Sequence, residues 1–234
     1  MSSTTVAAIS GKITARIASI HIDPACNTFL NDCFRQFGIT VVSADDDPIL
    51  LLNRQKFEAC VLRLYDPDAD RILKAARNSP SNRRLVIYGI ARNTQEAMRY
   101  STYGINAVLD EPLDRQSVLK VVRATHLLVI HELRRYVRIP VASHLEIDVG
   151  GQSPLPGSTV EVSSGGISLR CPVQLPKSDP VRLILNLPGI EKLSVRAFVC
   201  WYRESEKVYG IRFDSTDERR LKVRGWIDQY LEIV

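Results

Sequence analysis

The chain changes its secondary-structure pattern once, near residue 131, and this change limits the folds it can adopt. Before that point, five short apolar runs alternate with helix-forming segments. After it, six apolar runs follow one another, separated by turns rich in glycine, proline and serine. Alternating strands and helices predict a parallel sheet covered on both faces, whereas consecutive short strands predict an antiparallel barrel or sandwich. We therefore expect two domains, residues 1–130 and 131–234.

The first half carries start and stop signals for its helices. Asp-Pro pairs at positions 23–24 and 47–48 each place an N-cap before the first helical residue. Gly38 follows a helical segment at the position where a left-handed residue ends a helix. We expect strands at residues 15–22, 39–43, 57–64, 84–90 and 106–110. We expect helices at residues 25–37, 49–54, 67–78, 94–103 and 114–133. The order predicts an α/β fold with a five-stranded, parallel, doubly wound sheet.

The sequence pattern of the second half predicts an all-β domain. Its expected strands are residues 141–149, 158–163, 167–170, 181–187, 193–201 and 208–213. Six short strands at this spacing are typical of a small antiparallel barrel. A terminal helix over residues 216–234 would cover one opening of the barrel. Trp201, at the end of a strand, is interpreted as a core aromatic residue.

Composition and charge exclude several classes of protein. The 45% hydrophobic and 24% charged residues indicate an ordinary globular chain, and no apolar run is long enough to span a bilayer. The N-terminus lacks the features of a signal peptide, so we expect a cytoplasmic protein. The cysteines and histidines show no metal-ligand spacing. No paired carboxylates, nucleophile–base pair or phosphate-binding loop is evident, so we expect neither an enzyme nor a metal site.

Two short motifs flank the start of the second half. The first is Arg-x-x-x-Arg at Arg134 and Arg138, and the second is acid-x-Ser-x-x-Gly at Glu161, Ser163 and Gly166. A guanidinium group is planar and charged. It can donate two parallel hydrogen bonds to a phosphate or a base edge, and it can stack on a ring. Serine and glycine at a turn supply a hydroxyl, backbone N–H groups and room for close approach. Together the motifs predict a site for an anion with flat faces.

With these motifs, the segment from about residue 133 to residue 234 resembles the PilZ domain, whose members bind the bacterial second messenger cyclic di-GMP. Ile139-Pro140 after the first motif and the strands at residues 197–201 and 209–213 also fit the family pattern. The resemblance implies a six-stranded antiparallel barrel with a terminal helix. It also implies a non-catalytic nucleotide-binding protein of second-messenger signalling, with cyclic di-GMP as its ligand and no further cofactor.

The resemblance assigns roles to particular residues. Arg134 and Arg138 would bind guanine and phosphate, and Arg135 would support them. Ser163 and the amides before Gly166 would complete the other side of the pocket. One position departs from the family, because Glu161 stands where the family has Asp or Asn. Glutamate keeps the charge but is one methylene longer, which would affect affinity rather than the fold.

Roughly the first 125 residues resemble, in layout, the receiver domain of two-component response regulators. The chemistry of that family is missing. The phosphoacceptor aspartate falls on Arg63 and the functional lysine on Glu111, while the magnesium-binding acidic pair falls on His21 and Ile22. A cation cannot form an acyl phosphate, and without carboxylates there is no hard-oxygen magnesium site. We therefore interpret this half as a pseudo-receiver that makes protein contacts.

The segment between the halves allows more than one interpretation. Residues 131–139 would form an arginine-bearing linker arm. The helix before it carries an apolar run at residues 127–130 that either packs against both domains or forms a homodimer.

The leading hypothesis is a cyclic di-GMP effector that changes its interdomain arrangement or its contact with an unidentified protein partner. The first alternative is a PilZ adaptor that does not bind nucleotide, which Glu161 favours. The second is a nucleotide-controlled DNA-binding regulator, which a pI near 9 favours. Because the net charge of +5 is spread evenly along the chain, we do not expect a nucleic-acid partner.

Overall fold

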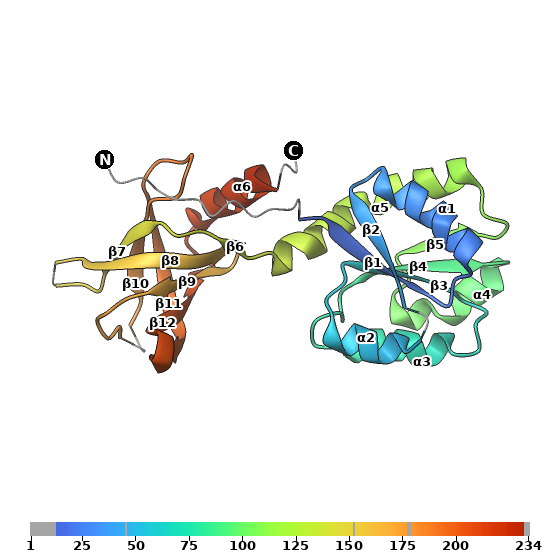
Figure 1. The fold of residues 1–234 in the computed structure, drawn as a ribbon, viewed down its shortest axis with the longest axis horizontal. Coiled ribbons are helices and arrows are strands. Elements are labelled where there is room, and N and C mark those ends of the chain that lie inside the picture. Colours follow the sequence, from blue (N-terminus) through green and yellow to red (C-terminus); the bar gives the residue numbers. More distant parts are fainter. Residues whose placement is uncertain (1–12, 45, 152, 177–178, 232–234) are drawn as a thin grey trace. The chain divides into compact units, whose positions relative to one another are not determined.

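The computed structural model describes residues 13–44, 46–151, 153–176 and 179–231, which fall into two compact units (Figure 1). The division lies between Leu133 and Arg134, a few residues after the boundary expected from the sequence. Residues 1–12 of the first expected domain and residues 232–234 of the second lie outside the described residues. Each unit is a separate fold with its own core.

A parallel sheet forms the centre of the N-terminal unit. Its strands are β1 (Ala15–Ile20), β2 (Ile39–Ser43), β3 (Ala59–Arg63), β4 (Val86–Ala91) and β5 (Ala107–Asp110). They pair in parallel in the order β2-β1-β3-β4-β5. This is the flavodoxin-like doubly wound order, which receivers share. The predicted five-stranded sheet is confirmed.

All five expected helices are present, and each begins within two residues of its expected start, although the helix expected to end at residue 103 ends at Arg99 and is followed by a 3-10 turn over Ser101–Tyr103. They are α1 (Pro24–Arg35), α2 (Pro48–Arg54), α3 (Ala69–Asn78), α4 (Thr94–Arg99) and α5 (Arg115–Tyr136). The Asp23 side chain accepts a hydrogen bond from the Cys26 amide at the start of α1, and Asp47 does the same for the Leu50 amide at the start of α2. Gly38 adopts the left-handed conformation after α1, with φ of 68°. These caps satisfy amides that have no partner within the helix.

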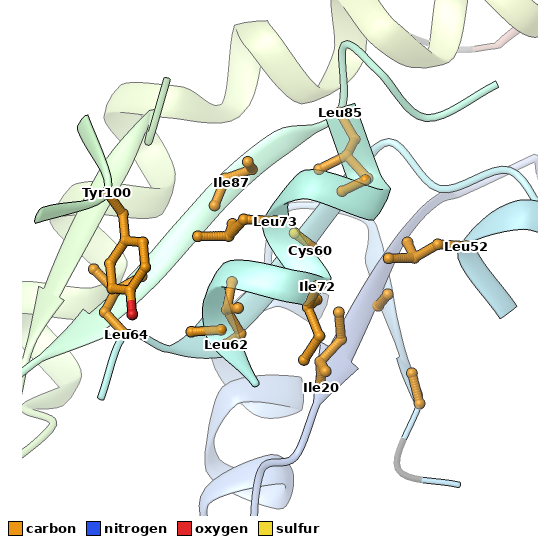
Figure 2. Close-up of a cluster of buried hydrophobic side chains, with 14 of the residues drawn as sticks. Ile20, Leu52, Cys60, Leu62, Leu64, Ile72, Leu73, Leu85, Ile87 and Tyr100 are labelled. Carbon is orange, nitrogen blue, oxygen red and sulfur yellow. The ribbon is translucent and has the colours of Figure 1, made fainter. Parts of the chain in front are cut away.

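Both faces of the sheet are buried under helices. On one face, Ile72 and Leu73 of α3 point toward the strands that carry Ile20 and Leu62 (Figure 2). On the other face, the Tyr88 ring on β4 packs edge-on against Phe34 of α1, with ring centroids 5.2 Å apart. Burial of apolar surface on both faces is the main favourable term in the folding of such a unit.

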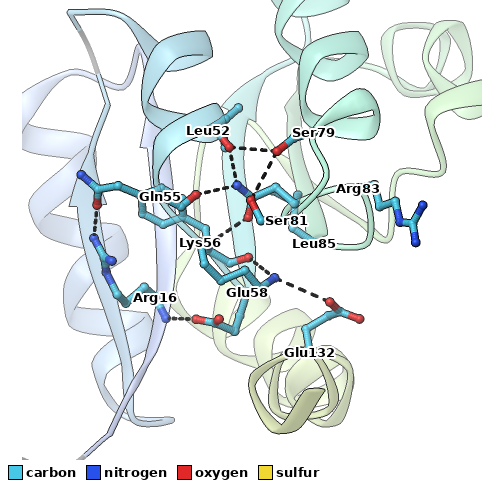
Figure 3. Close-up of polar contacts among 12 residues, drawn as sticks. Arg16, Leu52, Gln55, Lys56, Glu58, Ser79, Ser81, Arg83, Leu85 and Glu132 are labelled. Atoms are coloured by element: carbon cyan, nitrogen blue, oxygen red, sulfur yellow. Dashed lines mark hydrogen bonds and ion pairs between the residues drawn. The ribbon is translucent and has the colours of Figure 1, made fainter. Parts of the chain in front are cut away.

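A polar network closes the amino-terminal edge of this sheet (Figure 3). The buried Asn82 side chain accepts from the Phe57 amide at 2.8 Å and donates to the Leu52 and Gln55 carbonyls at 2.6 and 2.7 Å. These three bonds satisfy backbone groups that the end of α2 and the start of β3 leave without partners. Such buried groups are costly when they are not paired.

Polar side chains of helix α5 hold it against this unit. The Tyr88 hydroxyl lies 2.7 Å from the Thr125 hydroxyl, and burial raises the pKa of Tyr88 to about 12. Further along the helix, the buried Glu132 carboxylate lies 3.6 Å from the Lys56 ammonium group (Figure 3). The helical apolar pattern then continues to Tyr136, because no glycine or proline interrupts it. The expected linker arm over residues 131–139 is therefore helical over its first six residues, which corrects the prediction.

The C-terminal unit is a closed antiparallel barrel. Its strands are β7 (His144–Asp148), β8 (Leu155–Ser163), β9 (Gly166–Arg170), β10 (Val181–Leu185), β11 (Leu193–Arg203) and β12 (Val208–Phe213). They run in the order β8-β7-β10-β11-β12-β9, and the pairing of β8 with β9 closes the barrel. A two-residue strand, β6 (Ile139–Pro140), pairs with the end of β8. The predicted six-stranded barrel is confirmed.

A terminal helix, α6 (Arg220–Tyr230), packs on the barrel through Val223, Trp226 and Ile227. The Trp226 indole N–H donates to the Pro188 carbonyl at 2.8 Å. The helix begins later than the expected residue 216, because the Asp217 carboxylate binds the Arg196 and Arg219 amides in a turn before it.

Candidate functional site

The arginine segment, residues 134–138, leaves α5 after Tyr136 and continues through Val137 and Arg138 into the short strand β6. Val137 and Ile139 are buried, whereas the Arg138 side chain between them is 64% exposed. Successive side chains of a strand point to opposite faces, so the buried neighbours hold Arg138 toward solvent. Pairing of Pro140 with Glu161 then brings this segment beside the end of β8.

The second motif forms the turn between β8 and β9. The Ser163 hydroxyl donates to the Gly166 carbonyl at 3.0 Å across this turn. A Cβ atom on Gly166 would overlap the Ile211 carbonyl oxygen of β12, whereas one on Gly165 would meet open space. Glycine at position 166 is therefore required for the close approach of β9 and β12.

These two segments line one wall of a cleft of about 190 Å³. Four of the six predicted site residues reach it: Arg138, Glu161, Ser163 and Gly166. β11 and β12 also line the cleft, through residues that include Trp201 and Arg212, neither of which is among the six predicted site residues.

Trp201 lies at the cleft rather than in the core, so its interpretation as a core aromatic residue was wrong. A β-bulge between Val199 and Trp201 shifts the register of β11, so that Trp201 pairs with Gly210. The indole lies against Gly210, where a Cβ atom would overlap the ring, and the tryptophan remains 43% exposed. Gly210 was the sequence signal that could have located this ring.

The cleft combines two cations with one carboxylate. The Arg138 guanidinium lies 3.9 Å from the Glu161 carboxylate, and both side chains are well exposed. An exposed pair at this distance is weak, because solvent screens it. Arg138 is therefore available to an anionic ligand, and Arg212 adds a second positive charge to the lining of the cleft.

The remaining two predicted site residues point elsewhere. Arg134 and Arg135 occupy the last turn of α5, and neither lines the cleft. The Arg134 Nε atom lies 2.7 Å from the Asp228 carboxylate of α6. The Arg134 carbonyl nevertheless accepts a hydrogen bond from the Ser164 hydroxyl at 3.3 Å. The backbone of Arg134 is thus at the second motif, while its side chain is not in the cleft.

A second cluster occupies the carboxyl edge of the N-terminal sheet. The Arg63 guanidinium lies 2.6 Å from the Asp23 carboxylate and 3.6 Å from Glu111. The Tyr65 hydroxyl donates to Glu111 at 2.7 Å, and Arg92 stacks on the Tyr65 ring at 3.5 Å. The hydrogen bond from Arg63 is the main cause that lowers the pKa of Asp23. Each carboxylate here already has a cationic or hydroxyl partner.

Magnesium does not fit this edge. The cation of Arg63 stands where a carboxylate would be needed, and divalent magnesium requires oxygen ligands. Within the described ranges, no group of three or more His, Cys, Asp or Glu side chains is placed to hold a metal ion.

The PilZ domain family model matches residues 132–232, and this segment is a PilZ domain. No curated protein matches the sequence significantly. In the parts of the chain that the structure describes, no helix is long and apolar enough to cross a membrane.

Solved receiver structures are similar to the N-terminal half. The chemotaxis response regulator CheY4 of Vibrio cholerae is 14% identical, with a TM-score of 0.43 and coverage of 48% of this chain and 98% of that one. The receiver domain of a Pseudomonas aeruginosa sensor histidine kinase, solved with magnesium in its active-site cleft, is 19% identical, with a TM-score of 0.42 and coverage of 49% and 98%. These likenesses concern the fold alone, which the strand order defines independently.

Substitution of Gly166 by alanine should destabilise the barrel by about 1–3 kcal/mol, because the added Cβ forces β9 and β12 apart. Gly165→Ala is the matched control and should change stability by less than about 0.5 kcal/mol. Both tryptophans, Trp201 and Trp226, lie in this unit, so urea unfolding followed by tryptophan fluorescence reports on it alone. Equal unfolding midpoints for the two variants would contradict the close approach at Gly166.

The Arg63–Asp23 pair should make the stability of the N-terminal unit depend on pH. Because the folded pKa of Asp23 is lowered, its stabilising effect is complete above the unfolded pKa of about 4 and is lost as the pH falls through the lower, folded value. Arg63→Gln should therefore reduce the free energy of unfolding at pH 6, and the deficit should shrink toward pH 3. The control is Arg71→Gln, which removes a more exposed arginine 3.9 Å from Asp68. Urea unfolding followed by far-UV circular dichroism would measure both, and a deficit that is constant with pH would refute the assignment.

Proposed function

We propose that the PilZ domain binds cyclic di-GMP in the cleft between the β8–β9 turn and β11–β12. The observation that carries this proposal is the convergence of Arg138, Glu161, Ser163 and Gly166, from two separate motifs, on one cleft. The family match supports the same ligand, because PilZ domains form a family of cyclic di-GMP receptors.

The chemistry of the cleft fits a guanine nucleotide. Guanine presents O6 and N7 as paired acceptors, which one arginine fork can contact together. Arg138 is exposed and positioned for this contact. The indole of Trp201 offers a flat face, and stacking of a base on an aromatic ring contributes about 1–3 kcal/mol. Backbone amides at Gly165 and Gly166, together with Arg212, would receive phosphate oxygens.

The size of the cleft indicates how much of the ligand it would hold. Its volume of about 190 Å³ is below the roughly 300–1,000 Å³ of complete small-molecule pockets. We infer that the cleft takes one guanine and an adjoining phosphate, while the rest of the ligand lies against the arginine segment. Arg134 and Arg135 would then join the site from the last turn of α5.

Glu161 has a role in either state of the site. In the free protein, its carboxylate lies beside the Arg138 guanidinium. With ligand, it would accept from the N–H edge of guanine or keep Arg138 oriented toward the base. Its greater length compared with Asp or Asn would change affinity without removing the contact.

Ligand binding would act on the rest of the chain through the arginine segment. Ordering this segment around cyclic di-GMP would change the arrangement of the two units, or the contact of the receiver-like unit with a protein partner. The ligand can shift such an equilibrium only by its difference in affinity for the two arrangements. We propose a regulatory, non-catalytic protein of the cytoplasm that uses no cofactor.

A PilZ adaptor that binds no nucleotide is the second candidate. It is favoured by the carboxylates that already face both motif arginines, Asp228 at Arg134 and Glu161 at Arg138. The DNA-binding alternative gains no support from the cleft, because a carboxylate, Glu161, lines it together with the two cations.

Calorimetric titration of cyclic di-GMP into the full chain should show saturable binding. Arg138→Ala should weaken binding at least about tenfold, because a hydrogen bond to a charged group contributes about 1.5–3 kcal/mol. Arg182→Ala is the matched control, since it removes an exposed arginine on β10 that does not line the cleft. No binding by the unmodified chain would favour the adaptor, and unchanged binding by Arg138→Ala would place the ligand elsewhere.

A further inference from the structure

The side chain of Arg134 is held away from the cleft by one carboxylate. Its Nε atom lies 2.7 Å from Asp228 Oδ1, and the two side chains are only 20% and 25% exposed. The backbone of the same residue is bound to the turn of the second motif, where its carbonyl accepts a hydrogen bond from the Ser164 hydroxyl. The backbone of Arg134 therefore contacts the turn of the second motif, while its side chain is engaged by Asp228.

We propose that Asp228 is a built-in competitor of the ligand for Arg134. This inference rests on the proposed function. The Asp228 carboxylate occupies guanidinium positions that a phosphate of cyclic di-GMP would take, and binding requires Arg134 to exchange one anion for the other. Asp228 would thereby set the ligand concentration at which the protein responds.

The position of Asp228 does not depend on Arg134. Helix α6 is fixed to the barrel by buried Val223, Trp226 and Ile227, and by the bond from the Trp226 indole to Pro188. The carboxylate is thus presented by a rigid helix, whereas Arg134 stands at the end of a helix that gives way to an extended strand. The arginine is the member of the pair that can move.

The Arg134 and Asp228 side chains are close together but do not form a well-oriented hydrogen bond. The Arg134 Nε and Asp228 Oδ1 atoms are shielded from solvent, yet their geometry does not satisfy a hydrogen bond. Removing charges from water is costly unless hydrogen bonds compensate it. A phosphate can accept two parallel N–H bonds from one guanidinium group, so it can replace this carboxylate at a small cost.

The competing explanation is a purely structural contact, in which Asp228 fastens the end of α5 to the barrel and helps to form the site. The two explanations predict opposite changes in ligand affinity when the Asp228 carboxylate is removed. A competitor lowers affinity, so its removal tightens binding, whereas a structural contact preorganises the site, so its removal weakens binding.

The test is calorimetric titration of cyclic di-GMP into the full chain and into Asp228→Asn, which removes the charge and keeps the shape. We expect Asp228→Asn to bind about 5- to 50-fold more tightly, within the usual range of coupling between two binding events. Glu218→Gln is the control, because it removes the same charge just before α6 from an exposed residue. It should leave affinity within about twofold, because an exposed charge is screened by solvent. Asp228→Ser repeats the measurement if Asn disturbs the helix.

A double-mutant cycle with Arg134→Ala shows whether the increase in ligand affinity caused by Asp228→Asn acts through Arg134. We expect the gain from Asp228→Asn to disappear in the Arg134→Ala background. Equal or weaker binding by both Asp228 variants, or a gain that persists without Arg134, would overturn the competitor while leaving the proposed function intact. Absence of binding in the unmodified chain and in every variant would instead overturn the proposed function, and the competitor with it.

Discussion

The closure of the C-terminal barrel is the constraint on which the candidate site depends. β9 pairs with β8 on one side and with β12 on the other, and only glycine at position 166 allows β9 to approach β12 so closely. This closure sets the turn that carries Ser163 near β11, which carries Trp201, and β12, which carries Arg212. Without it, the two sequence motifs would not face an aromatic platform.

The two units use charged residues in different ways. In the N-terminal unit, Arg63 is paired with Asp23 and Glu111 at the carboxyl edge of the sheet. These charges have partners within the unit. In the PilZ domain, Arg138 is exposed and only weakly paired, so that an external anion can compete for it.

The sequence was sufficient for most of the fold but for only part of the site. Local signals placed the helices, because caps such as Asp23 and Asp47 act on amides a few residues away. The two motifs identified Arg138 and Gly166, which the structure brings to one cleft because their segments lie beside the same strand ends. The exposure of Trp201 was missed because a bulge in β11 reverses which face it occupies. The direction of the Arg134 side chain was missed because its partner, Asp228, lies on a helix remote in the sequence.

The proposed cyclic di-GMP site places a guanine base in the cleft beside Trp201. The most direct measurement is tryptophan fluorescence in a Trp226→Phe variant, in which Trp201 is the remaining tryptophan of the chain. We predict saturable quenching on titration with cyclic di-GMP, because the base stacks on or covers the exposed indole. Calorimetric binding of cyclic di-GMP without any change in Trp201 emission would contradict this site.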